Sequence, residues 1–173
     1  GFDLRKQVKI IASGKIISAF QLVKNLSLGA DICNSARGMM LALGCVQSLS
    51  CNTNKCPTGV ATQDPKLAKG LDVTDKSERV YRFHKKTLHA LMDMLSSTGH
   101  VSTTELNRTH IFRRVDQASI ARYDEIFPLV KTGTLLGDDI PERFKLHVKE
   151  ANSDSFMPCS LLAEIEEETK SVS

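Results

Sequence analysis

The N-terminal part of the chain alternates between short apolar runs and polar breaks. Residues 8–12 are mostly apolar and are followed by a Ser–Gly pair, which favours a short buried strand. Apolar positions then recur at helical spacing up to about residue 28, with Ser18 as a cap and Gly29 after the last turn. Residues 30–34 resemble a second short strand. This order predicts a βαβ unit with parallel strands and a right-handed crossover.

The middle of the chain turns from apolar to polar and back. Residues 39–46 are apolar and predict the start of a helix, whereas residues 47–70 are rich in Asn, Thr, Pro, Gly and Lys and predict a long ordered loop. Long loops inside compact domains are usually either functional or disordered, and the cysteines of this loop favour function. Residues 75–78 fit a capping box, and apolar side chains at helical spacing then predict a long helix that ends at Gly99.

The C-terminal part reads as short helices and a polar tail. Residues 102–105 repeat the capping signal for a short helical turn, and residues 117–127 predict a further helix. Pro141 suits the first turn of a helix that runs to about residue 150. Residues 151–173 combine several Glu with Ser and Thr, which predicts a frayed helix or a solvated, flexible tail.

Two parallel strands cannot bury both of their faces alone. The chain also starts at Gly1 with neither Met nor the apolar stretch of a signal peptide. Both observations favour a piece of a larger protein, in which other strands complete the sheet.

Composition narrows the class of protein. Apolar residues make up 41%, charged residues 25%, and the net charge is +3, which is typical of a globular domain and not of a nucleic-acid binder. The absence of Trp and the presence of two Tyr argue against base stacking. No apolar run reaches the ~20 residues of a membrane span. Three of the five cysteines fall within twelve residues, which favours a reducing, cytoplasmic setting with a metal or redox site.

Two short polar segments follow the two predicted strands. Small residues there let backbone N–H groups approach an anion, and an arginine fork can neutralise a phosphate. On spacing alone the signal is weak, because a tight turn and a surface ion pair explain such residues more often. The candidate phosphate-binding residues are Ser13, Gly14, Lys15, Ser35, Ala36, Arg37 and Gly38.

Three cysteines, Cys45, Cys51 and Cys56, have the spacing C-x5-C-x4-C. Thiolates are the ligands of iron–sulfur clusters, and three of them suit a three-iron cluster or a four-iron cluster with its fourth ligand elsewhere. Zinc prefers four ligands, and His84 or His89 could complete such a site. Spacing alone leaves the cluster, zinc and three free thiols open. Elsewhere, Cys33 and Cys159 lack any pattern of a functional site.

Several segments together resemble the FMN-binding barrel of glutamate synthase, in order and in spacing. A further similarity, at residues 110–115, is to the C-terminal extension of the stand-alone members called FMN-binding glutamate synthase family proteins. The resemblance covers about residues 8–136. Its strongest segments are residues 10–15, 29–31, 34–38, 42–45, 51–59, 75–76, 78–80 and 83–84.

The resemblance implies an α/β fold, namely the last two strands of a (β/α)8 TIM barrel followed by a mainly helical C-terminal extension. Residues 1–70 would be the end of the FMN-binding barrel with its iron–sulfur loop. Residues 71–150 would be the helical extension, and residues 151–173 the acidic tail.

The resemblance also implies two cofactors and a reaction. FMN would have its phosphate near residues 13–15 and 36–38, and a 3Fe–4S cluster would be bound by Cys45, Cys51 and Cys56. Such enzymes convert 2-oxoglutarate and ammonia, or glutamine-derived nitrogen, through 2-iminoglutarate into L-glutamate. Their electrons come from ferredoxin or an NAD(P)H-linked subunit and pass through the cluster.

The first six barrel strands and an amidotransferase domain are not in this sequence, so no catalytic residue can be assigned and we expect no activity from this piece alone. A non-catalytic iron–sulfur electron-transfer module, or a relic of such an enzyme, is the alternative. A helical interaction domain with a structural zinc loop is a third interpretation.

Overall fold

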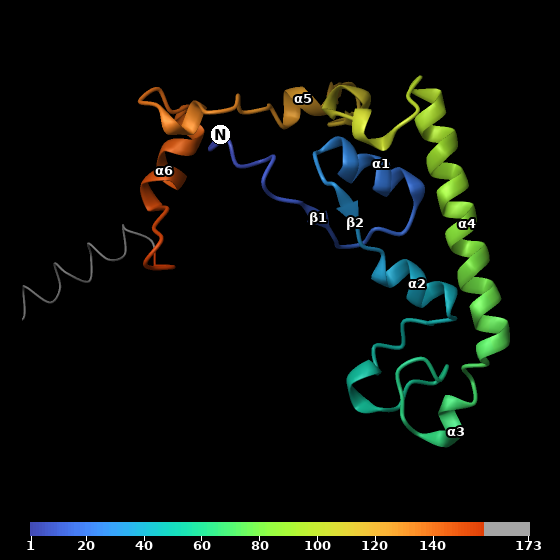
Figure 1. Ribbon diagram of the computed structural model, residues 1–173. Helices are drawn as coiled ribbons and strands as arrows, with labels where there is room; N and C mark the ends of the chain where they lie inside the picture. Colours follow the sequence, from blue (N-terminus) through green and yellow to red (C-terminus); the bar gives the residue numbers. More distant parts are fainter. Residues whose placement is uncertain (158–173) are drawn as a thin grey trace, which may run out of the picture. The chain divides into compact units, whose positions relative to one another are not determined.

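A computed structural model describes residues 1–157 of the chain (Figure 1). The chain divides into two compact units. One unit is Lys9–Pro128, and the other combines Gly1–Val8 with the residues from Leu129 onward. The candidate site lies within the larger unit.

The larger unit begins with the predicted βαβ arrangement. Strands β1 (Ile11–Ala12) and β2 (Ile32–Cys33) are parallel, and helix α1 (Ala19–Ser27) connects them. A capping box starts α1: the Gln21 N–H donates to Ser18 Oγ at 3.4 Å, and the Ser18 N–H donates to Gln21 Oε1 at 3.0 Å. The predicted cap at Ser18 and the predicted end at Gly29 are therefore confirmed. Gln21 adds a second, reciprocal bond to the cap that was not predicted.

Helix α2 (Ala36–Ala42) begins three residues before the predicted start at residue 39. The residue ahead of it, Ser35, makes no capping bond and donates its hydroxyl to the Ile16 carbonyl at 2.6 Å. Ser35 thus makes a tertiary contact in place of a local cap, and α2 begins at the next residue.

The predicted loop 47–70 contains a 3-10 turn, η1 (Cys51–Thr53), and a single helical turn, α3 (Pro65–Ala68). Asn54 organises it, because its side chain accepts from the Gln63 N–H at 2.6 Å. The loop is therefore ordered, as expected, although it is not free of helix.

The long helix α4 (Val73–Ser97) starts earlier than the capping box at 75–78 predicts. Asp72 is the cap, and it accepts from the Asp75 N–H at 2.8 Å. The predicted end is confirmed, because Gly99 follows the last turn with a positive φ of 77°. Helix α4 packs along α1 and α2 (Figure 1).

After α4 the chain forms the 3-10 turns η2 (Thr103–Glu105) and η3 (Arg108–His110). Ser102 caps η2 by accepting from the Thr104 N–H at 3.3 Å, which confirms the predicted turn.

The predicted helix at 117–127 is wrong over most of its length. The chain instead forms an antiparallel hairpin of β3 (Phe112–Arg114) and β4 (Ile120–Arg122), and only α5 (Tyr123–Ile126) is helical. Asp116 is the physical reason: its carboxylate accepts two backbone N–H bonds from the following turn, both 2.8 Å long. These bonds close the turn and bring β4 beside β3.

The smaller unit contains η4 (Thr134–Leu136) and helix α6 (Glu142–Glu150). Pro141 directly precedes α6, which confirms the predicted helix. Most of the predicted acidic tail, residues 158–173 with Cys159, lies outside the described residues.

The core of the larger unit lies between α1 and α4 and extends to the segment that carries η2, η3 and α5. Leu95 is its most buried side chain, at 1% exposure. The small parallel sheet is only partly covered: Ile11 and Ile32 are 55% and 50% exposed, and Ile10, just before β1, is 45% exposed. The buried residues of this core are Ala19, Val23, Leu91, Leu95, Leu106, Ile111 and Tyr123.

The described residues thus form a mixed arrangement of helices and small sheets, compatible with the predicted α/β class. Within residues 1–157, no helix combines the length and the apolar character needed to cross a membrane.

Candidate functional site

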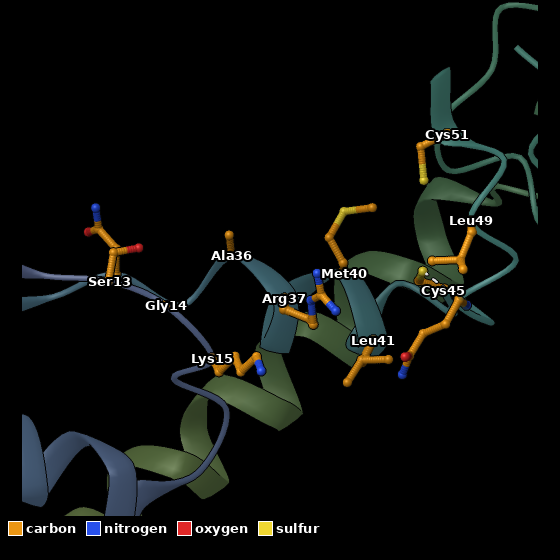
Figure 2. A pocket seen from close by; sticks show the side chains of 12 residues that line it. Ser13, Gly14, Lys15, Ala36, Arg37, Met40, Leu41, Cys45, Leu49 and Cys51 are labelled. Carbon is orange, nitrogen blue, oxygen red and sulfur yellow. Dashed lines mark hydrogen bonds between the residues drawn. The ribbon is translucent and has the colours of Figure 1, made fainter. Parts of the chain in front are cut away.

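A pocket of about 390 Å³ opens where β1 and β2 end (Figure 2). It brings together five of the seven candidate phosphate-binding residues and two of the three clustered cysteines. These predicted residues are Ser13, Gly14, Lys15, Ala36, Arg37, Cys45 and Cys51. The parallel pairing of β1 with β2 explains the convergence, because both segments leave the sheet at the same edge.

The remaining two phosphate candidates do not line this pocket. Ser35 holds the Ile16 carbonyl at 2.6 Å. Gly38 is buried against α4, and a Cβ there would lie 2.6 Å from Ser35 Oγ and 3.3 Å from the Phe83 ring. Both residues therefore fix α2 in position beside the pocket.

The charge of the pocket favours an anion. Lys15 and Arg37 line it, and no Asp or Glu is among the described residues around it. Gly14 precedes Lys15 with a φ of 99°, which turns the backbone sharply at the end of β1. Two cations that line one pocket without a described carboxylate beside them can hold a phosphate group.

Three lining residues have a left-handed backbone although none of them is Gly. Their φ angles are 55° for Lys15, 55° for Gln47 and 58° for Leu49. Such backbone costs on the order of 1–3 kcal/mol per residue and concentrates at functional sites. The turn at Gln47 directs its N–H to Cys45 Sγ at 3.4 Å.

Sequence reasoning missed five of the lining residues. Nothing in the sequence marks Gln47 or Leu49 as left-handed, so only the fold reveals them. Asn34 could have been predicted, because it is a polar residue that directly follows a predicted strand. The missed residues are Asn34, Met40, Leu41, Gln47 and Leu49.

The three clustered cysteines are free thiols in different surroundings. Cys45 is half-buried and Cys51 is exposed, whereas Cys56 is 5% exposed and lies outside the pocket lining. Within residues 1–157, no three His, Cys, Asp or Glu side chains are grouped closely enough to hold a metal ion.

Cys56 is the thiol with the most specific environment. Its Sγ lies 3.4 Å from Thr58 Oγ1. The Thr58 hydroxyl, and then the backbone N–H groups of Ala61, Thr58 and Val60, lower the pKa of Cys56 to about 7 against the opposing effect of burial. A thiol that readily becomes a thiolate is suited to bind a soft metal.

The other candidates have ordinary roles. Burial raises the pKa of the Cys33 thiol, which fits a packed side chain. His89 pairs with Asp93 at 3.0 Å on the outside of α4, and His84 is exposed on the same helix.

Residues 2–101 match a protein family described as the conserved region in glutamate synthase. The chain is 40% identical over 125 residues to the glutamate synthase large subunit-like protein YerD of Bacillus subtilis, which covers 72% of this chain and 24% of that protein. It is 38% identical over 96 residues to the archaeal glutamate synthase [NADPH] of Methanocaldococcus jannaschii, covering 56% and 19%.

A more distant similarity extends further along the chain. The glutamate synthase [NADH] of Saccharomyces cerevisiae is 25% identical over 155 residues, which is 85% of this chain and 7% of the yeast protein. The chain therefore spans about a quarter or less of the length of these relatives.

Proposed function

Because the chain belongs to the glutamate synthase family, we propose that it forms the cofactor-holding end of an oxidoreductase that produces L-glutamate. The reaction is the reductive amination of 2-oxoglutarate with ammonia or glutamine-derived nitrogen, through 2-iminoglutarate. The nicotinamides in the names of two relatives support an NAD(P)H-linked electron donor, with ferredoxin as the other option. The free thiols of the cysteine segment fit a reducing, cytoplasmic compartment.

We assign the parallel pair β1–β2 to the end of a (β/α)8 barrel. Ile11 and Ile32 are about half exposed although they stand in the strands, so the sheet as described lacks covering layers. Parallel sheets are almost always buried on both faces. The remaining barrel strands would supply that cover, and they would also carry the catalytic and substrate-binding groups.

Lys15 and Arg37 would hold the phosphate of FMN, and the pocket residues fit that group. The lining offers two cations, a sharp glycine turn and no described carboxylate. Bound FMN would supply the hydride that reduces the imine. The protein's part is to fix the phosphate end. Gly38 supports it by seating α2 on α4, and Ser35 by tying the start of α2 to Ile16.

Cys45, Cys51 and Cys56 would bind a 3Fe–4S cluster. The donor chemistry fits, since three free thiols lie on one segment and the environment of Cys56 favours its thiolate. Cys45 and Cys51 line one pocket and Cys56 does not, so binding one cluster would require the loop to rearrange.

The observation that carries this proposal is one pocket lined by Lys15 and Arg37 together with Cys45 and Cys51. The test is to purify the full polypeptide without oxygen and to measure its absorption and EPR spectra, iron and acid-labile sulfide. We expect flavin bands and a three-iron signal. Iron and sulfide without flavin would instead favour the electron-transfer module, and zinc without sulfide the structural zinc loop.

A matched pair of variants tests the phosphate assignment. Arg37→Gln should weaken FMN binding about tenfold or more, because a charge-assisted bond to phosphate is lost. Arg82→Gln is the control, since Arg82 pairs with Glu78 on the exposed side of α4. Equal FMN affinity in both variants would contradict the assignment, and riboflavin binding should be insensitive to either change.

A further inference from the structure

Leu49 combines two unfavourable features. Its side chain is 87% exposed to solvent although it lines the pocket where β1 and β2 end. Its backbone is left-handed, with a φ of 58°, a conformation that the Cβ of a leucine disfavours. One exposed leucine is ordinary on a protein surface, but strained backbone concentrates at ligand clamps and switch regions. The two features together connect Leu49 to the ligand of the pocket.

Leu49 belongs to an exposed segment, residues 46–49, which lies between α2 and the 3-10 turn η1. Gln47 of the same segment is also left-handed, with a φ of 55°. Hinges are a few loop residues whose backbone angles absorb a movement. Because Gln47 and Leu49 are both exposed and outside the core, a change in their backbone angles displaces no core side chain.

The pocket has a cationic part and an apolar part. Lys15 and Arg37 are its cations, and its apolar side chains include Met40, Leu41 and Leu49. Figure 2 shows Lys15 and Leu49 far apart along the lining. The ligand that suits both parts carries an anionic group on a body with apolar surface. The cations bind the anion, and the apolar side chains gain free energy when the body covers them.

We propose that residues 46–49 are a strap over this pocket, in which Leu49 turns inward and covers the body of FMN while Lys15 and Arg37 hold its phosphate. This inference rests on the proposed function, because it takes FMN as the ligand. Closure buries the exposed leucine and lets its backbone leave the left-handed region, so that bound FMN favours the closed strap. Contacts of this kind act mainly on the rate at which a ligand leaves. Leu49 thus slows the loss of FMN.

The test is a stopped-flow measurement of FMN association and dissociation, followed by flavin fluorescence, in the full polypeptide and two variants. Leu49→Ala removes the covering side chain. Val46→Ala is the matched control, because Val46 is 63% exposed on the same segment and is not among the lining residues. Riboflavin, which lacks the phosphate, and inorganic phosphate, which lacks the body, are measured as separate ligands.

We expect Leu49→Ala to release FMN about tenfold faster, with little change in the association rate, because most of the apolar surface of the side chain is lost. Riboflavin affinity should fall by a similar factor, whereas binding of inorganic phosphate should not change. Val46→Ala should behave like the unmodified protein. Unchanged release of FMN from Leu49→Ala, or equal acceleration in Val46→Ala, would overturn the inference. An equal loss of inorganic phosphate binding in Leu49→Ala would also overturn it, because Leu49 would then act on the cationic part.

Closure itself is tested by amide hydrogen exchange at residues 46–49 of the unmodified protein. These N–H groups should exchange more slowly with saturating FMN than with saturating inorganic phosphate, because only FMN has a body for the strap to cover. Equal exchange with the two ligands would contradict the strap. Failure of the unmodified protein to bind FMN would instead overturn the proposed function.

Discussion

His100 and His110 face each other with their Nε2 atoms 3.1 Å apart. The Asn107 N–H donates to His110 Nδ1 at 3.2 Å, so the hydrogen of a neutral His110 ring is on Nε2 and is donated to His100. His100 then carries its own hydrogen on Nδ1, which lies 3.1 Å from a Glu105 carboxylate oxygen. This chain of bonds ties the segment after α4 to η3.

Removal of His110 should therefore destabilise the larger unit. We expect His110→Ala to lower the free energy of unfolding by about 1–2 kcal/mol, because the ring's bonds to Asn107 and His100 are both lost. Urea unfolding followed by circular dichroism measures this. His89→Ala is the control, since its pair with Asp93 is exposed and should contribute under about 0.5 kcal/mol. Equal losses of stability in the two variants would show that the His100–His110 contact does not stabilise the unit.

Ser27 should be a site where a substitution stabilises the protein. Its side chain is 3% exposed, and its Oγ has no hydrogen-bond partner among the residues that the structure describes. Ser27→Ala should raise the free energy of unfolding by about 1 kcal/mol, because a buried hydroxyl without a partner is removed. The urea midpoint should rise. Ser18→Ala, at the cap of the same helix, should lower it by about 1 kcal/mol. A fall in both variants would mean that Ser27 has a partner.

Gly59 should tolerate no side chain. Gly59 and Gly99 both have a φ of 77°, but only at Gly59 would a Cβ meet the backbone, 2.4 Å from the Leu67 carbonyl oxygen. Gly99→Ala should cost about 1–2 kcal/mol from left-handed strain alone. Gly59→Ala should cost clearly more and should also reduce the iron content, because the turn that holds Cys56 must move. Comparable unfolding energies and full iron in both variants would contradict this.

The β3–β4 hairpin should loosen in acid. The Ser119 hydroxyl first, and then backbone N–H groups of Ala118 and Ser119, hold the pKa of Asp116 below its ordinary value of about 4. A depressed carboxyl pKa stabilises the folded hairpin above that ordinary value, and the contribution is lost as the pH falls through the lower folded value. Amide exchange at Ala118 and Ser119 between about pH 6 and 2 measures it. Asp116→Asn should flatten the pH dependence, and an unchanged profile would contradict the assignment.

Local signals were enough to predict much of the fold. Ser18 and Gly29 bracket α1, Gly99 follows α4 and Pro141 precedes α6, because caps and breakers act through the nearest few residues. The helix predicted at 117–127 was wrong because one side chain, Asp116, closes a turn directly before this segment and pairs it as a strand. The bonds of a single side chain thus outweighed the local preference for a helix.

The candidate site divides in the same way. The sequence was enough to predict the residue types of the site. These are two glycine-containing segments with Lys15 and Arg37, and a run of cysteines. Their meeting in one pocket was not, and neither were the left-handed turns at Gln47 and Leu49 that line it. Those turns depend on packing that fixes a backbone conformation which the residues themselves disfavour.

Residue types and short-range spacing were enough to predict the βαβ order, the family resemblance and the chemistry of the candidate ligands. Which of these residues lie together became clear from the fold. It placed Ser35 and Gly38 in the packing of α2, left Cys51 exposed and gave Cys56 a hydroxyl partner in Thr58. Hydrogen bonds and burial depend on distances between segments, and spacing along the chain does not specify those distances.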